Sequence, residues 1–204
     1  MNSDSCFTFT CPVKTNSGNI ALENLPVELS GLNAGKPLVV TNIAKVGRKA
    51  VRTLTGAFGD SGMSLGVFDS LGDKVDPALI EQLRTTFIEE EYDSIIALGG
   101  GTIVDSAKIL NLTVSLKITD VRNLSAQTPV NRNLLPLVVV PTADATGLET
   151  AQFARLNGAV LSSEYLAPVL VVIDPRLTRG KDVKTIYATG LAALGRALEG
   201  QIIA

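Results

Sequence analysis

The chain of 204 residues carries 18 basic and 20 acidic side chains, and its net charge of −2 gives no electrostatic attraction to nucleic acid or to an anionic membrane. It contains no histidine, which excludes Ser–His–Asp and Cys–His catalytic arrangements and any imidazole metal ligand. The longest apolar run, at 134–140, is too short for a membrane span. The N-terminal residues lack the basic and apolar regions of a signal peptide, so we expect a cytoplasmic protein.

Predicted strands and helices alternate along the chain. Apolar or alternating runs predict strands at 7–13, 37–42, 64–68, 95–98, 134–140 and 169–173. Apolar residues at helical spacing predict helices at 20–29, 43–58, 77–87, 102–110 and 183–203, and residues 112–134 are expected to be irregular. This alternation predicts an α/β fold with a parallel sheet and helices on both faces.

Polar or small residues follow three of the predicted strands. They are Thr41–Asn42, Gly99–Thr102 and Thr142–Thr146. Because open parallel sheets bind ligands beyond the carboxyl ends of their strands, we expect the three segments to converge on one ligand site.

The segment Gly99–Thr102 joins a strand directly to a helix. Three glycines let a ligand approach the backbone, and the helix that follows presents unpaired N–H groups and a partial positive charge. Thr102 is a candidate helix cap, and Asp105 falls in the first turn. The pattern therefore predicts a phosphate site. A plain strand-to-helix turn without a ligand stays open as an alternative, because the dinucleotide fingerprint needs a third glycine where this chain has Val104.

Four ordered motifs occupy residues 99–108, 141–149, 172–178 and 188–199. The first reads Gly-Gly-Gly-Thr-Ile-Val-Asp-Ser-Ala-Lys, and the third reads Val-Ile-Asp-Pro-Arg-Leu-Thr. Together the motifs resemble those of the iron-dependent alcohol dehydrogenase family, relatives of glycerol dehydrogenase and dehydroquinate synthase. The resemblance implies a Rossmann-like dinucleotide-binding domain at 1–180. It implies that 181–204 is the first helix of a helical domain that the chain otherwise lacks.

The resemblance also implies NAD or NADP as cofactor. It assigns cofactor contacts to Asn42, Asp76, Gly99, Gly100, Gly101, Thr102, Asp105, Thr142 and Thr146. Asn42 stands where the family has an aspartate that contacts the adenosine ribose, and Asp76 stands where it has an asparagine. A further carboxylate, Asp144, falls in the threonine-rich loop at 141–149. We expect it to repel the pyrophosphate unless it points away.

No metal and no catalytic residue are expected in this chain. The family holds its metal with one aspartate and three histidines, and the first two ligand positions here are Ala192 and Arg196. Alanine offers no donor atom and arginine is a permanent cation, so the residues do not suit a metal.

Three interpretations remain open at this stage. The first is an NAD(P)-dependent alcohol oxidoreductase, the second a non-catalytic nucleotide-binding domain, and the third a partial enzyme completed by another chain. The helix predicted at 183–203 carries a wide apolar stripe. We therefore expect a homo-oligomer or a partner chain that covers it, in addition to a bound dinucleotide.

Overall fold

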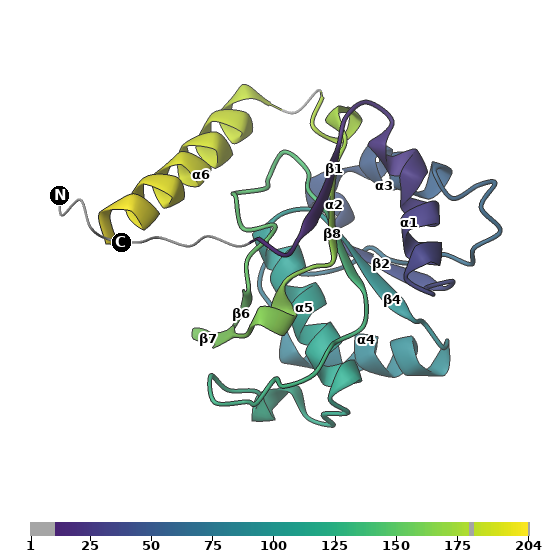
Figure 1. Cartoon of the computed structure of the whole chain (residues 1–204), viewed down its shortest axis with the longest axis vertical. Helices are drawn as coiled ribbons and strands as arrows, with labels where there is room; N and C mark the ends of the chain where they lie inside the picture. Colours follow the sequence, from purple (N-terminus) through teal and green to yellow (C-terminus); the bar gives the residue numbers. More distant parts are fainter. Residues whose placement is uncertain (1–10, 180–181, 204) are drawn as a thin grey trace.

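The computed structural model describes residues 11–179 and 182–203. Its centre is a six-stranded sheet with the strand order β1-β8-β5-β4-β2-β3 (Figure 1). The strands are β1 (Lys14–Ser17), β2 (Pro37–Thr41), β3 (Gly66–Phe68), β4 (Ser94–Leu98), β5 (Leu137–Val140) and β8 (Leu170–Ile173). All neighbouring pairs run parallel, so the predicted α/β fold with a parallel sheet is confirmed.

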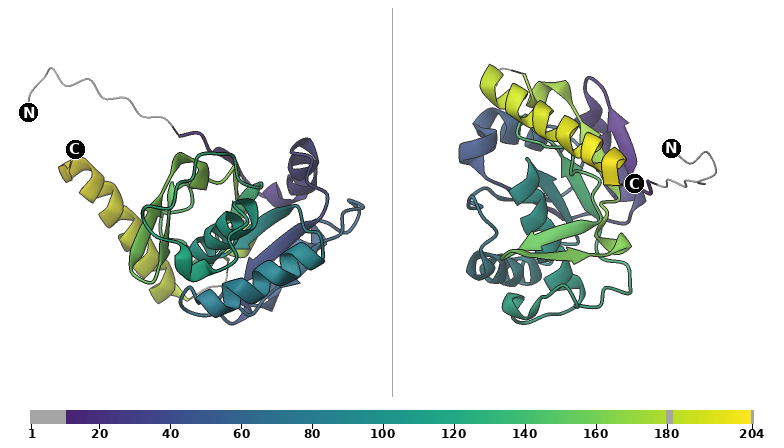
Figure 2. Two further views of the ribbon diagram at one scale, coloured as in Figure 1. Left: turned by 90° about the horizontal axis from the view of Figure 1, so that it is seen from below. Right: turned by 90° about the vertical axis from the view of Figure 1, so that its left-hand side faces the viewer.

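Helices cover both faces of the sheet, and the last helix lies to one side of it (Figure 1). They are α1 (Leu25–Gly31), α2 (Ile43–Val46), α3 (Arg48–Gly56), α4 (Pro77–Glu89), α5 (Gly101–Ser115) and α6 (Val183–Ile203). Short 3-10 helices are η1 (Ala21–Asn24), η2 (Val121–Asn123), η3 (Glu164–Leu166) and η4 (Pro175–Leu177). The chain steps from β2 to β3 in one direction and through β4 to β5 in the other. Right-handed crossovers then place α3 on one face and the neighbouring helices α4 and α5 on the other (Figure 2).

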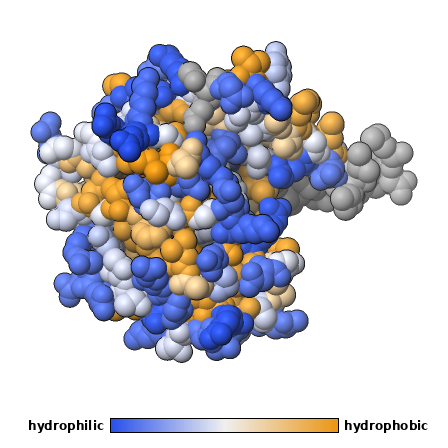
Figure 3. All heavy atoms as spheres, turned by 180° about the vertical axis from the view of Figure 1, so that it is seen from behind, coloured by the Kyte–Doolittle hydropathy of each residue, from blue (hydrophilic) through white to orange (hydrophobic). Residues whose placement is uncertain are grey.

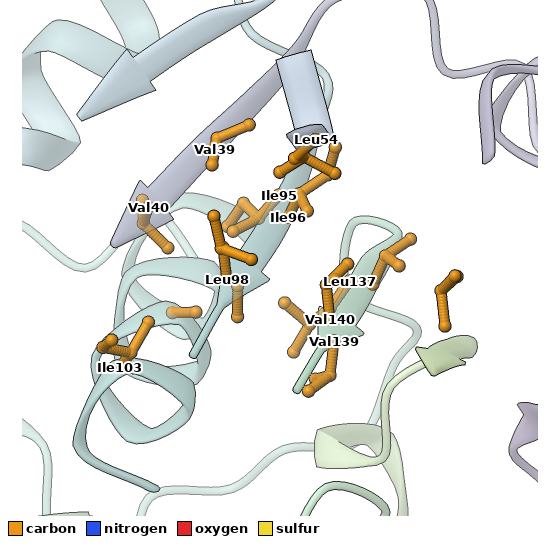
Figure 4. Packing of buried hydrophobic residues seen from close by; sticks show 14 of the residues in the cluster. Val39, Val40, Leu54, Ile95, Ile96, Leu98, Ile103, Leu137, Val139 and Val140 are labelled. Atoms are coloured by element: carbon orange, nitrogen blue, oxygen red, sulfur yellow. The ribbon is translucent and has the colours of Figure 1, made fainter. Parts of the chain in front are cut away.

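The core lies between the sheet and these helices. The residues labelled in Figure 4 belong to one buried cluster; among them are Val39, Ile96 and Val139 of three adjacent strands, Leu54 of α3 and Ile103 of α5. The strand residues are fully buried, and burying one such side chain contributes about 1.5–3 kcal/mol. This rigid centre fixes the carboxyl ends of β2, β4 and β5 side by side.

The first strand lies later in the chain than predicted. Residues 11–13 form no strand, and residues 7–10 of that prediction lie outside the described residues. β1 instead falls in the polar segment that follows, for which no strand was predicted, and it pairs with β8 at the edge of the sheet. An edge strand has little burial, so its polar side chains conceal it from a search for apolar runs.

Two predicted helices are divided, and one is longer than expected. The helix predicted at 43–58 breaks at Gly47, whose φ of 85° is unsuited to a helix and separates α2 from α3. The segment predicted as a helix at 20–29 becomes η1 followed by α1, with Pro26 in the first turn of α1, where it loses no hydrogen bond. α5 runs on to Ser115, into the segment expected to be irregular.

An antiparallel hairpin lies outside the main sheet and was not predicted. It consists of β6 (Phe153–Leu156) and β7 (Ala159–Ser162). Its turn residues Asn157 and Gly158 both have positive φ, which is the typical chemistry of a tight hairpin turn. The hairpin packs on α5 through a second apolar cluster that includes Ile109, Leu156 and Leu161.

The last helix, α6, lies to one side of the sheet (Figures 1 and 2). It contacts the loop that follows β5: the Thr189 hydroxyl donates to the Ala143 carbonyl at 3.0 Å. One of its faces is apolar and exposed, formed by Val183, Ile186, Tyr187, Leu191, Leu194 and Leu198. Elsewhere, the side shown in Figure 3 mixes hydrophilic and hydrophobic residues. No helix within the described residues is long and apolar enough to cross a membrane.

Candidate functional site

A cleft of about 810 Å³ opens at the carboxyl ends of the strands. Its walls come from the glycine turn between β4 and α5, the loop after β5, the loop before α4, the β6–β7 hairpin and α6. The residues expected from the sequence that line it are Gly100, Gly101, Thr102, Asp105 and Thr146. Those that lie outside its lining are Asn42, Asp76, Gly99 and Thr142.

The three glycines of the turn have three different surroundings. Gly99 has a φ of 140°, which disfavours any other residue, and a Cβ there would collide with Ile103. A Cβ on Gly100 would collide with the backbone of Asp144. A Cβ on Gly101 would meet nothing within 4 Å. Gly101 is therefore the glycine whose missing side chain leaves open space at the helix N-terminus.

The carboxylate of Asp144 points at the glycine turn. The Gly100 N–H donates to its Oδ2 at 3.2 Å, and the Thr142 hydroxyl donates to Oδ1. Gly100 is the N-cap of α5, so Asp144 lies where the helix attracts negative charge. From the sequence we expected Asp144 to repel a pyrophosphate unless its side chain pointed away from the glycine turn. In this structure the side chain points toward the turn.

Thr102 does not cap its own helix. Its hydroxyl donates instead to the Asp73 carbonyl at 3.4 Å, which ties the glycine turn to the loop before α4. Asp105 lies one turn further along and accepts a hydrogen bond from the Arg155 N–H at 3.2 Å. Burial raises the pKa of Asp105 above its usual value. These contacts join three walls of the cleft at the start of α5.

Lys108 follows the cleft-lining Asp105 by one turn of α5 and is almost completely buried. Its ammonium donates to the backbone carbonyls of Ala151 and Phe153, the second at 3.0 Å. Burial lowers the pKa of Lys108 to about 8, against the opposing effect of Asp105 and Glu149. The residue fastens α5 to the start of β6 and so holds the hairpin against the cleft.

Asn42 and Asp76 both act as helix caps. The Asn42 side chain accepts from the Lys45 N–H at 3.2 Å at the start of α2, and the Asp76 side chain accepts from the Ala78 N–H at 2.9 Å at the start of α4. Each satisfies a helix N–H that would otherwise lack a partner. The structure thus shows both residues as helix caps, and neither of them lines the cleft.

Several lining residues were not identified from the sequence. They are Lys45, Asp73, Lys74, Val75, Ile103, Leu148, Arg155, Asn157, Gly158, Asp182 and Thr185. The dipeptide Asn157–Gly158 was a usable signal for the hairpin. The loop before α4 gave no comparable signal, because Asp73 and Lys74 read as ordinary surface charges; Lys45 and Asp73 form an ion pair at 3.0 Å across the rim.

α6 contributes Arg196 to the cleft. Its Nη1 donates to the Thr146 carbonyl at 2.5 Å and to the Ala192 carbonyl at 3.4 Å. Ala192 has no side-chain donor and Arg196 carries a fixed positive charge, so this place in the cleft does not fit a metal cation. Among the described residues, no group of three or more acidic or thiol side chains is arranged to hold a metal ion.

The chain was compared with known proteins. The family model "Iron-containing alcohol dehydrogenase" matches residues 12–175. The NAD-dependent methanol dehydrogenase of Bacillus methanolicus is 23% identical over 202 residues, which are 95% of this chain and 52% of that protein. The chain spans about half the length of the curated relatives it matches.

Solved structures share the fold. A 1,3-propanediol oxidoreductase superposes with a TM-score of 0.85 at 22% identity, covering 95% of this chain and 52% of that one. Sulfoacetaldehyde reductase from Bifidobacterium kashiwanohense, solved in complex with NAD+, gives a TM-score of 0.84 at 20% identity, covering 96% of this chain and 53% of that one. Because the family model covers most of the sequence, this chain belongs to the iron-containing alcohol dehydrogenase family.

Proposed function

We propose that this chain is an NAD(P)-binding domain of an alcohol dehydrogenase-like protein, with the dinucleotide in the cleft at the carboxyl ends of β2, β4 and β5. The observation that carries the proposal is the open space at Gly101, which lines the cleft in the first turn of α5. The N–H groups of Gly101 and Thr102 have no acceptor within the helix, whereas that of Ile103 already bonds to the Gly100 carbonyl at 3.0 Å. A phosphate oxygen is the natural acceptor at such a helix end.

The residues around Gly101 suit the rest of a dinucleotide. Lys74 and Arg155 supply positive charge on two walls, and the hydroxyl oxygen of Thr102, which donates to Asp73, can still accept from a ligand hydroxyl. The relatives support the cofactor class, since one is named as NAD-dependent and one was solved with NAD+. Because Asn42 and Asp76 are engaged as helix caps, we propose no strong preference between NAD and NADP.

The test is calorimetric titration of NAD and NADP into the wild type and Gly101→Val. A branched side chain in the open space should weaken binding at least about tenfold, or 1.4 kcal/mol. Gly31→Val is the matched control, since Gly31 also lies in a helix with nothing within 4 Å of its Cβ position. If the wild type binds neither dinucleotide, or Gly101→Val binds as tightly as Gly31→Val, the proposal is wrong.

We further propose that the chain by itself does not oxidise alcohols. Ala192 and Arg196 do not suit the metal that would polarise the alcohol oxygen, and such assistance is worth several kcal/mol. The experiment incubates the purified chain with Zn²⁺ or Fe²⁺, NAD(P) and a panel of alcohols, and follows the reduced cofactor. Alcohol-dependent formation of the reduced cofactor would contradict the proposal.

The second candidate function is an alcohol oxidoreductase completed by another chain. The exposed apolar face of α6 favours it, because six large side chains there face solvent at 48–68% exposure. Covering each of them is worth up to about 1.5–3 kcal/mol. We propose that a second copy or a partner chain covers this face. If the chain forms the reduced cofactor from an alcohol once a separate helical domain of a relative is added, that result would favour this candidate.

A further inference from the structure

Arg196 is held in the cleft by neutral groups alone. Its Nη1 donates to the backbone carbonyls of Thr146 and Ala192, and neither carries a charge. By contrast, the half-buried Arg176 pairs with both Asp174 and Glu23 at 2.7 Å. Within residues 11–179 and 182–203, no carboxylate forms an ion pair with Arg196. Its positive charge is therefore fixed in position but not neutralised by the protein.

The hydrogen-bonding capacity of Arg196 is also incompletely used. A guanidinium has five N–H donors in one plane, and only those on Nη1 bond to described residues of the protein. The N–H groups of Nε and Nη2 keep the fork geometry that binds carboxylate, sulfonate and phosphate oxygens in pairs. An anionic group is thus the ligand that this side chain can bind best.

Acidic side chains on the cleft walls do not compete for Arg196. The Asp144 carboxylate is bonded to the Gly100 N–H and the Thr142 hydroxyl. The Asp182 carboxylate accepts from the N–H and the hydroxyl of Thr185, at 2.9 and 2.6 Å. Both carboxylates are held by their own chain, so an external anion is free to take the open side of Arg196.

From these contacts we propose that Arg196 forms a subsite for an anionic substrate group, on the α6 wall of the cleft beside the dinucleotide. The proposal rests on the proposed function and narrows it to substrates that carry a carboxylate, sulfonate or phosphate. Arg196 and Gly101 line the same cleft from different elements, so one ligand can lie at the glycine turn and a second at α6. The same chemistry would also serve a phosphate of the dinucleotide itself, and the experiment separates these two sources.

The experiment titrates 3-hydroxypropanoate, and its uncharged counterpart 1-propanol, into the full chain with and without saturating NAD, followed by NMR. The variants are Arg196→Gln, Arg196→Lys, and the control Arg122→Gln, which changes an exposed arginine outside the cleft. We expect the wild type and the control to bind the hydroxy acid at least tenfold more tightly than the alcohol. Arg196→Gln should lose this preference and Arg196→Lys should keep part of it.

The affinity for NAD, measured separately by calorimetry, shows whether Arg196 binds an anionic substrate group or a phosphate of the dinucleotide. We expect Arg196→Gln to leave it unchanged within twofold, and thermal unfolding checks that both variants are folded. If Arg196→Gln weakens NAD binding tenfold, Arg196 serves a dinucleotide phosphate and the proposal is overturned. A wild type that binds NAD without preferring the hydroxy acid overturns the proposal and leaves the proposed function standing. A wild type that prefers the hydroxy acid but binds no NAD supports the subsite and contradicts the proposed function.

Discussion

Replacing Asp144 with asparagine should strengthen dinucleotide binding. The carboxylate accepts from the Gly100 N–H at 3.2 Å and lines the same cleft as Gly101. A pyrophosphate at the N-terminus of α5 would lie beside this negative charge and compete with it for the helix N–H groups. An asparagine side chain would keep the size of the aspartate and a carbonyl oxygen for the Gly100 N–H, and would remove the charge; its NH2 group would face the Thr142 hydroxyl, which can accept as well as donate.

The magnitude follows from Coulomb's law. Two unit charges about 5 Å apart repel by about 3 kcal/mol at an effective dielectric constant of about 20. Asp144 is only half-buried, and the cleft is open to solvent and salt, so we expect about half of this value. A change of about 1.4 kcal/mol is a tenfold change in affinity. Asp144→Asn should therefore bind NAD about tenfold more tightly than the wild type.

Calorimetry with NAD at low and high salt measures this effect. Asp60→Asn is the control, since it removes a carboxylate from an exposed position outside the cleft. The gain in Asp144→Asn should shrink as salt rises, because salt screens the repulsion. Weaker or unchanged binding by Asp144→Asn would refute the reasoning and show that the carboxylate does not oppose the ligand.

Three further predictions concern the turn, the buried lysine and the last helix. Gly100→Ala places a Cβ against the backbone of Asp144, and urea unfolding should show a loss of about 1–3 kcal/mol. Burial lowers the pKa of Lys108 from 10.5 to about 8, so the unfolded chain binds more protons between these values and stability should rise with pH there. The difference between wild type and Lys108→Met, followed by urea unfolding from pH 8 to 10, should rise by up to about 2 kcal/mol, and a flat difference would contradict this. Leu194→Glu on the exposed face of α6 should abolish self-association seen by light scattering; a wild type that is already monomeric would be the contrary result.

The central strands were predictable because parallel strands covered on both faces consist of nearly continuous apolar residues. β2, β4 and β5 are buried at every position; β2 and β5 lie within the predicted strand segments, and β4 begins one residue earlier than predicted, at Ser94. β1 was missed for the converse reason: three of its four residues are exposed, and it is specified by backbone pairing with β8. The pattern of side chains within residues 14–17 does not show which distant strand pairs with them.

The roles of individual polar residues were less predictable than their places. Asn42 and Asp76 each follow a strand and precede a helix, a position that suits both a ligand contact and a helix cap. The structure shows the caps, through bonds to the N–H groups of Lys45 and Ala78. The two roles use the same residue types at the same spacing, so sequence pattern alone does not separate them.

Asp144 shows why the occupant of a helix N-terminus cannot be derived from the motif. The sequence predicted an electropositive N-terminus for α5. It also contains the carboxylate of Asp144 in a different loop, 44 residues away from Gly100. Whether that carboxylate meets the helix depends on how the loop after β5 packs, and the absence of a Cβ on Gly100 lets it pack directly on the turn. A helix end that attracts anions binds a carboxylate of its own chain more readily than a free anion. The carboxylate is tethered to the helix, so the contact costs no translational entropy of association. The bond from Gly100 to Asp144 is thus itself a sign of an anion-binding helix end, and a phosphate ligand gains only the difference between its own contacts and those that Asp144 already makes.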